Sequence, residues 1–167
     1  MTNTRQFFGT DGIRGMANVE PLTPETALRL GQAAAQVLLK DSNSMDWPRC
    51  IIGRDTRSSG ASVGVDVQLA GVIPTPAVAY LTRTSGAAVG VVISASHNPF
   101  HDNGIKFFGG DGYKLADATE LAIEQALLSS DRIEESTRAK PGKVGRISQL
   151  EGAVDQYIHS VIDGLST

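Results

Sequence analysis

The sequence has little of what marks secreted, membrane or nucleic-acid-binding proteins. It contains a single cysteine, Cys50, which excludes an internal disulfide. No apolar run approaches the roughly 20 residues that span a bilayer, and the N-terminus lacks a secretory signal pattern. A formal net charge of −3 is the opposite of the basic excess typical of nucleic-acid-binding proteins. We therefore expect a cytoplasmic protein that binds neither nucleic acid nor membranes, with Cys50 as a buried, inert thiol.

Two common catalytic signatures are also missing. There is no Gly-x-Ser-x-Gly elbow, so a serine hydrolase is weakly supported, and we expect the adjacent side chains of Ser96 and His97 to diverge. His97 and His101 have the spacing of a helical metal pair. Pro99 lies between them, which makes a helix there improbable and argues against a metal site.

The rest of the chain alternates segments typical of helices and strands. Helical spacing and start signals predict helices over 22–40, from Thr75 onward, over 117–130 and over 148–165. Apolar runs predict strands over 50–53, 65–71 and 87–94. This alternation favours one α/β domain with a mixed sheet, for which 167 residues suffice.

Particular residues define several of these boundaries. Thr23 and Thr75 are predicted helix caps, each followed by a proline at the first helical position. Asp117 with Glu120 has the pattern of a capping box. Asn103-Gly104 is a turn signal, and "GGDG" at 109–112 is predicted to separate the two strands of a hairpin.

One connection is too short for the pattern. Only residues 54–64 join the strand at 50–53 to the strand at 65–71. A parallel crossover needs a dozen residues or more, usually including a helix. Either the two strands pair antiparallel, or a crossover helix is missing after about residue 60.

The stretch "VVISASHNPF" carries the strongest chemical signal. Ser96 follows a buried strand at its carboxyl end, where open α/β sheets bind their ligands, and Pro99 restricts Asn98 to an extended conformation. A serine hydroxyl is a weak nucleophile unless it is activated. The alternative is that Ser96, His97 and Asn98 only satisfy a tight turn.

Cationic side chains occur in three other segments. "FFGTDGIRG" places Thr10 and Arg14 in a glycine-rich loop of the kind that binds anions. Arg54 in "GRDTRSSG" follows a strand, and Lys106 alternates with core residues and could point toward Ser96. Ordinary turns and exposed ion pairs are the alternatives for these segments.

Taken together, "FGTDGIRG", "GRDTRSSG", "PTPAVAYL" and "SASHNPFHDNGIKFF" resemble the α-D-phosphohexomutase family over nearly the whole chain. The resemblance implies the first of four domains, an α/β fold with a mixed, mostly parallel sheet sandwiched by helices. Residues 1–145 would form the phosphoserine-bearing domain, and residues 146–167 a linker helix to a second domain that is absent here. The intact enzyme is a possible homodimer.

The resemblance also implies a reaction. Ser96 would be carried as a phosphoserine that exchanges its phosphoryl group with a hexosamine phosphate through a bisphosphate, with Mg²⁺ bound to the phosphoserine. Arg14 and Lys106 would supply positive charge, and Lys106 would also assist proton transfer. His97, Asn98, Thr10 and Arg54 would hold the loop, the phosphate or the substrate. The closest branch interconverts glucosamine 6-phosphate and glucosamine 1-phosphate.

Two departures from the family pattern limit what this chain does alone. The aspartate-rich loop that supplies the other metal ligands is absent, as are the sugar-selecting loops. The helix missing after residue 60 is one that family members carry. We therefore expect negligible mutase activity from this chain by itself. A phosphoglucomutase or phosphomannomutase domain, or a non-catalytic sugar-phosphate-binding module, remain alternatives.

Overall fold

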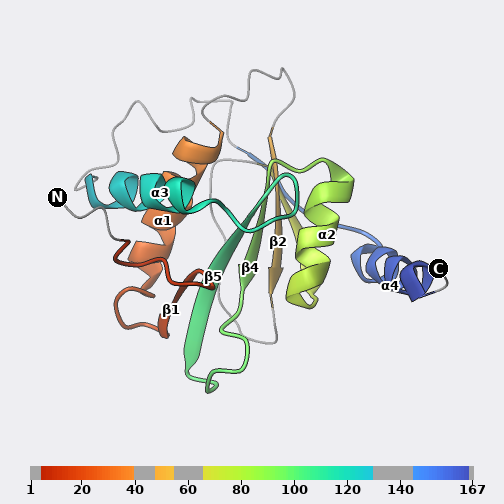
Figure 1. Cartoon of the computed structure of the whole chain (residues 1–167), viewed down its shortest axis with the longest axis horizontal. Coiled ribbons are helices and arrows are strands. Elements are labelled where there is room, and N and C mark those ends of the chain that lie inside the picture. Colours follow the sequence, from red (N-terminus) through yellow and green to blue (C-terminus); the bar gives the residue numbers. More distant parts are fainter. Residues whose placement is uncertain (1–4, 40–47, 55–65, 130–144, 166–167) are drawn as a thin grey trace.

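The computed structural model describes residues 5–39, 48–54, 66–129 and 145–165. These residues form a six-stranded sheet between two layers of helices (Figure 1). The strands are β1 (Ile13–Met16), β2 (Arg49–Arg54), β3 (Asp66–Val72), β4 (Val89–Ile93), β5 (Asp102–Gly109) and β6 (Ile147–Gln149). The helices are α1 (Pro24–Leu38), α2 (Thr75–Ser85), α3 (Asp117–Ser129) and α4 (Ala153–Leu165).

The sheet is mixed and mostly parallel, as the resemblance implied. Its order is β1-β5-β4-β2-β3-β6. β2 pairs in parallel with β3 and β4, and β3 pairs in parallel with β6. β5 pairs antiparallel with both β4 and β1. Every residue of β4 is buried, because helices cover both faces of this central strand.

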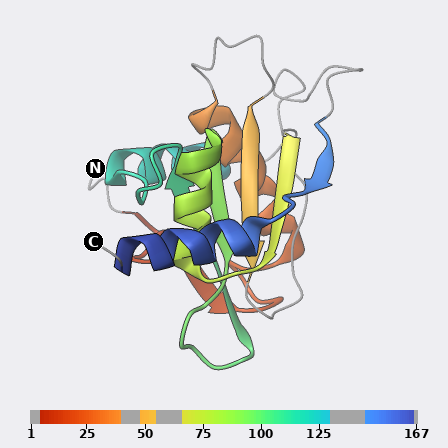
Figure 2. The same cartoon turned by 90° about the vertical axis from the view of Figure 1, so that its right-hand side faces the viewer.

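Each face of the sheet has its own apolar core. On one face, Leu30 of α1 and Ile123 of α3 belong to the same buried cluster as Ile13 of β1 and Phe107 of β5. On the other face, Val78 and Leu81 of α2 and Ala153 of α4 belong to the same buried cluster as Ile51 of β2 and Val92 of β4. Figure 2 shows α4 crossing in front of α2, and α4 also contacts β3.

The predicted helix starts are confirmed for α1 and shifted for α2. The Thr23 side chain caps α1 by accepting a hydrogen bond from the backbone N–H of Thr26 at 3.2 Å. α2 begins at Thr75 itself, with Pro74 in the capping position and no side-chain cap. Thr75 as a cap was therefore wrong by one residue.

Three local predictions on the second half of the chain were also wrong. Asn103 and Gly104 lie inside β5, because the chain reverses earlier, over residues 94–101. The turn at "GGDG" is present, but beyond it only Lys114 forms an isolated bridge, to Phe108. Glu120 is 2 % exposed and forms an ion pair with Arg5, so it does not complete a capping box.

The C-terminal segment contains a strand that the sequence pattern did not predict. Residues 148–165 were expected to be one helix, but Ile147–Gln149 pairs with β3 and α4 begins only at Ala153. All three residues of β6 are exposed, so they show no apolar alternation that could have identified an edge strand.

The structure excludes one of the two explanations for the short connection between β2 and β3, which is antiparallel pairing of the strands. The two strands are parallel neighbours. Residues 55–65, where the missing crossover helix was predicted, lie outside the described residues. That prediction therefore stays open.

Candidate functional site

Ser96 lies at the surface three residues after the carboxyl end of β4. Its side chain is exposed, and its backbone N–H donates to the Ser94 hydroxyl at 2.9 Å. The φ angle of Ser96 is +56°, in the left-handed region that disfavours residues with a Cβ atom. Strained backbone of this kind concentrates at functional sites. The loop therefore combines an unusual backbone conformation at Ser96 with a side chain that is exposed to solvent.

His97 contacts Ser96 directly. The Ser96 Oγ atom lies 3.3 Å from His97 Nδ1, so the expectation that these adjacent side chains diverge was wrong. Within the described part of the chain, no carboxylate pairs with His97 to orient it as in a hydrolase triad.

Arg14 and Lys106 converge on one carboxylate. Arg14, on β1, donates from Nη2 to Asp11 Oδ2 at 3.3 Å. Lys106, on β5, donates from Nζ to Asp11 Oδ1 at 3.3 Å, and its ammonium lies 5.4 Å from the centre of the Phe108 ring. The two cations are thus held near each other by Asp11, which was not among the predicted site residues.

Asn98 connects this cation pair to the serine loop. Its side-chain oxygen accepts from Arg14 Nη1 at 3.4 Å, and its amide nitrogen donates to Asp102 Oδ2 at 2.9 Å. Arg14 Nε is buried and has no hydrogen-bond partner among the described residues. The contact of Arg14 with the serine loop is therefore made through Nη1, and its Nε donor is left unsatisfied by the described residues.

The strand register explains why these distant segments meet. Arg14 of β1 lies opposite Gly104 of β5, whose carbonyl accepts from the backbone N–H of Ser94 just beyond β4. Lys106 is two residues along β5 and so shares a face of the sheet with Gly104. Antiparallel pairing of β1, β5 and β4 thus brings residues 11–14, 94–98 and 106 to one place.

The other predicted site residues lie around this cluster. Thr10 is exposed next to Asp11 in the tight turn closed by the Gly9–Gly12 bridge. Arg54 is the last residue of β2 and pairs with Ile93, the last residue of β4. Its backbone therefore lies at the carboxyl end of the parallel strands, where the chain continues from β4 to Ser96. Its side chain is outside what the structure describes. His101 lies 3.7 Å from Asp102 Oδ1, in a turn rather than a helix.

Two acidic residues of the cluster were missed as functional candidates. Asp11 stands between the glycines of "GTDGIRG", and Asp102 follows the His-Asn-Pro loop, but either could equally serve an ordinary turn. The spacing of Asp11 and Arg14, three residues apart, was the available signal for a local ion pair. The contact of Asp11 with Lys106 spans 95 positions and leaves no local signal.

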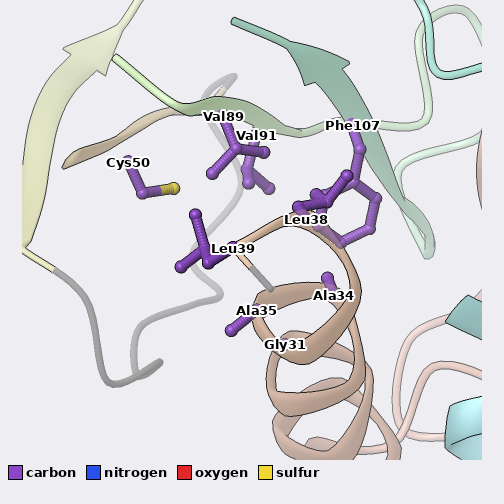
Figure 3. A pocket seen from close by; sticks show the side chains of 9 residues that line it. All are labelled: Gly31, Ala34, Ala35, Leu38, Leu39, Cys50, Val89, Val91 and Phe107. Carbon is purple, nitrogen blue, oxygen red and sulfur yellow. The ribbon is translucent and has the colours of Figure 1, made fainter. Parts of the chain in front are cut away.

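A small cavity on the opposite side of β4 is not part of this cluster. It measures about 30 Å³ between α1 and the sheet, and its walls include Leu38, Cys50 and Phe107 (Figure 3). The lining is apolar, so it offers no partners for a polar ligand or an ordered water molecule. Cys50 is buried as predicted, and burial raises the pKa of its thiol to about 12.

The described residues contain no group of three or more histidine, cysteine, aspartate or glutamate side chains that could hold a metal ion. Of the two carboxylates in the cluster, Asp11 is engaged by two cations and Asp102 accepts from Asn98. Mg²⁺ prefers several oxygen ligands in an octahedral arrangement. The donor set on the described residues does not fit such an ion.

The membrane prediction can be checked only on the same described residues. No helix among them has both the length and the apolar character that crossing a bilayer requires.

Comparison with known proteins agrees with the resemblance seen in the sequence. Residues 5–134 match the family described as phosphoglucomutase/phosphomannomutase, alpha/beta/alpha domain I. A phosphoglucosamine mutase of Desulforamulus reducens is 52% identical, with 97% of this chain and 38% of that protein covered. A phosphoglucosamine mutase of Anaeromyxobacter sp. is 47% identical, with 92% of this chain and 35% of that protein covered. The chain thus spans little more than a third of these relatives.

Solved structures agree with this assignment. A putative phosphomannomutase from Thermus thermophilus superposes with a TM-score of 0.67 at 30% identity, covering 87% of this chain and 33% of that one. The alignment with the Desulforamulus protein extends over 173 positions, more than the 167 residues here, so that relative has residues without a counterpart in this chain. The family match and the superposition agree that the chain belongs to the phosphoglucomutase/phosphomannomutase family of phosphohexomutases and corresponds to its α/β/α domain I.

Proposed function

We propose that this chain is the phosphoserine-carrying domain of a phosphohexomutase that interconverts glucosamine 6-phosphate and glucosamine 1-phosphate. The observation that carries the proposal is the exposed Ser96 hydroxyl, held with a φ of +56° in a loop that Asn98 ties to Arg14. The choice of glucosamine phosphate rests on the names of the relatives, which are phosphoglucosamine mutases. The residues that select the sugar are expected in the remaining length of such proteins.

The proposed reaction has two transfers. A sugar hydroxyl attacks the phosphorus of phosphoserine 96 and the bond from phosphorus to Ser96 Oγ breaks, so that a sugar bisphosphate forms and the proton of the attacking hydroxyl ends on Ser96 Oγ. The bisphosphate then reorients and Ser96 Oγ attacks its other phosphoryl group. The bond from that phosphorus to the sugar oxygen breaks, the serine proton ends on the sugar oxygen, and the second sugar phosphate leaves. Phosphoryl transfer asks the protein mainly for positioning and for neutralisation of charge.

The described residues suit these two tasks. A phosphoserine carries a charge of about −1.5 to −2 near neutral pH, so it needs cations close by. Arg14 and Lys106 provide them, and Lys106 is our candidate to exchange the proton with the sugar hydroxyl. His97 is placed at 3.3 Å to orient the Ser96 oxygen. Asn98 fixes Arg14, while Thr10 and Arg54 are proposed to contact phosphate or substrate.

We assign the metal to the complete enzyme. Mg²⁺ bound to the phosphoserine would neutralise part of its charge, but its other ligands have to come from beyond this chain. We therefore expect the isolated chain to show negligible mutase activity, and we place the protein in the cytoplasm.

We propose that α4 joins this domain to the next one. Ala153 is buried and Tyr157 packs against Tyr80 of α2, with ring centres 6.2 Å apart. The opposite side of α4 exposes an apolar stripe with helical spacing. The stripe comprises Val154, Ile158, Val161, Ile162 and Leu165. An exposed apolar stripe of this kind is typical of a contact surface. We propose that it packs against the next domain, because the relatives are nearly three times longer than this chain.

A chimera tests the proposed function. This chain would replace the matching domain of the Desulforamulus protein, and turnover of glucosamine 6-phosphate would be measured in a coupled assay with magnesium. We expect turnover by the chimera, loss of turnover and of the phosphoryl mass on Ser96→Ala, and neither loss on Ser129→Ala, an exposed serine at the end of α3. A folded chimera that never takes up a phosphoryl group would favour the non-catalytic binding module instead.

A further inference from the structure

Asp11 occupies the place where an anion would bind between the two cations. Its two carboxylate oxygens each take one partner, Arg14 Nη2 and Lys106 Nζ, both at 3.3 Å. The Asp11 side chain is 51% exposed, whereas those of Arg14 and Lys106 are 27% and 23% exposed. The carboxylate therefore covers the cations from the solvent side.

The fold holds Asp11 in this position. Gly9 and Gly12 close a turn with Thr10 and Asp11 at its tip, through a hydrogen bond of 3.0 Å from the Gly9 N–H to the Gly12 carbonyl. Gly12 has a φ of +83°, and a Cβ atom there would lie 2.3 Å from the carbonyl oxygen of Ile105. The turn is thus pressed against β5 next to Lys106. Asp11 reaches Lys106 because of this contact.

Fold stability does not account for this arrangement. Exposed ion pairs contribute little to the free energy of unfolding, because water screens them and the side chains lose entropy. Keeping an aspartate between two cations therefore gains almost nothing in stability. It does change the charge that the cations present to a third group.

The charge balance indicates what that change does. Arg14 and Lys106 carry two positive charges, and Asp11 leaves one of them uncompensated. With a dianionic phosphoserine at position 96 the four groups sum to −1, whereas without Asp11 they would sum to zero. Asp11 thus lowers by one the positive charge that the described residues present to the phosphoserine, independently of the charge that Mg²⁺ would add in the complete enzyme.

We propose that Asp11 is a positioning residue that serves as the resident counter-ion of Arg14 and Lys106 and competes with the phosphoryl group on Ser96. While Ser96 is unmodified, Asp11 holds both cations in place. When Ser96 carries the phosphoryl group, the Asp11 carboxylate weakens its hold, so that the group can pass on to a sugar. The inference rests on the proposed function and adds to it the residue that balances the phosphoryl charge.

The test measures the second ionisation of phosphoserine 96 on the full 167-residue chain. Phosphoserine would be incorporated at position 96 during translation, so the sample does not depend on any enzymatic activity. A ³¹P NMR titration then gives its pKa, which is near 6 for a free phosphoserine. Asp11→Asn should lower that pKa by about half a pH unit or more, because removing a nearby negative charge favours the dianion. Lys106→Met should raise it.

The matched control is Asp111→Asn, which removes the same charge at the far end of β5 and keeps the acceptor for the Tyr113 N–H. It should leave the phosphoserine pKa unchanged, and amide spectra would confirm that each variant is folded. If Lys106→Met raises the pKa but Asp11→Asn matches Asp111→Asn, the inference about Asp11 is refuted and the cation site stands. If none of the variants moves the pKa, the proposed phosphoserine site itself is refuted.

Discussion

The left-handed backbone of Ser96 makes a prediction that needs no assay of activity. A residue with a Cβ atom costs about 1–2 kcal/mol in this region, and glycine escapes that cost. Glycine also loses more conformational entropy on folding than alanine, which offsets about 0.4–1 kcal/mol of that advantage. Ser96→Gly should therefore be more stable than Ser96→Ala by roughly 0.5–1 kcal/mol, or about 1–4 °C in the melting temperature of a domain of this size.

The assay is urea unfolding of the two variants side by side, with equal slopes as the check that both unfold in the same way. Gly71→Ala calibrates the effect within the same chain. Gly71 has a φ of +76° and nothing within 4 Å of an added Cβ atom, so the substitution measures the backbone cost without a clash. If Gly71→Ala destabilises the chain while Ser96→Ala is as stable as Ser96→Gly, the Ser96 backbone is relaxed and its strain plays no part in the site.

Three further predictions concern the core, the N-terminal segment and α4. Burial raises the pKa of the Cys50 thiol from 9.0 to about 12, so the thiol of the unfolded chain ionises first as the pH rises. Relative to Cys50→Ala, the free energy of unfolding should therefore fall by about 1.4 kcal/mol per pH unit above pH 9. If both proteins show the same pH dependence of stability, this prediction is wrong. Glu124 accepts hydrogen bonds from the backbone N–H groups of residues 6–8 at 2.6–2.7 Å. Glu124→Gln should therefore lower the free energy of unfolding by about 2–3 kcal/mol and speed hydrogen exchange at those three amides. Unchanged exchange would mean that these contacts do not hold the N-terminal segment. The double variant Ile158→Asp and Ile162→Asp should have a free energy of unfolding within about 0.5 kcal/mol of the unmodified chain, because both residues are exposed. It should bind more weakly in trans to the remaining domains of a relative. A large loss of stability would instead show that the stripe packs within this domain.

The core of the fold could be predicted from the sequence because its signals are local. Thr23 and Pro24 define the start of α1 through contacts within one turn. β4 is covered on both faces and therefore reads as an unbroken apolar run. β6 gives no such signal, because its three residues are exposed and only their pairing with β3 makes them a strand.

The candidate site divides in the same way. Ser96 could be selected because it follows a buried strand within a distinctive loop, and the cations because they flank glycines or alternate with core residues. The contact between Asp11 and Lys106 could not be predicted, because it joins residues 95 positions apart. Outside the site, the buried carboxylates of Glu120 and Glu124 could not be interpreted from sequence for the same reason. Their partners near the N-terminus lie more than 110 positions away, and nothing local distinguishes a buried glutamate from an exposed one.

The exposure of the serine site gives a physical reason for the proposal that this chain alone has negligible mutase activity. Both Ser96 and Asp11 are open to solvent, and Asp11 pairs with Lys106 and Arg14. That openness lets a sugar phosphate approach, but it leaves water equally free to reach the phosphorus. Electrostatic stabilisation is strongest where water is excluded, so cations at an open surface can hold a phosphoryl group without accelerating its transfer much. A second wall that closes over Ser96 would supply the exclusion of water, and the remaining length of the relatives is where that wall has to come from.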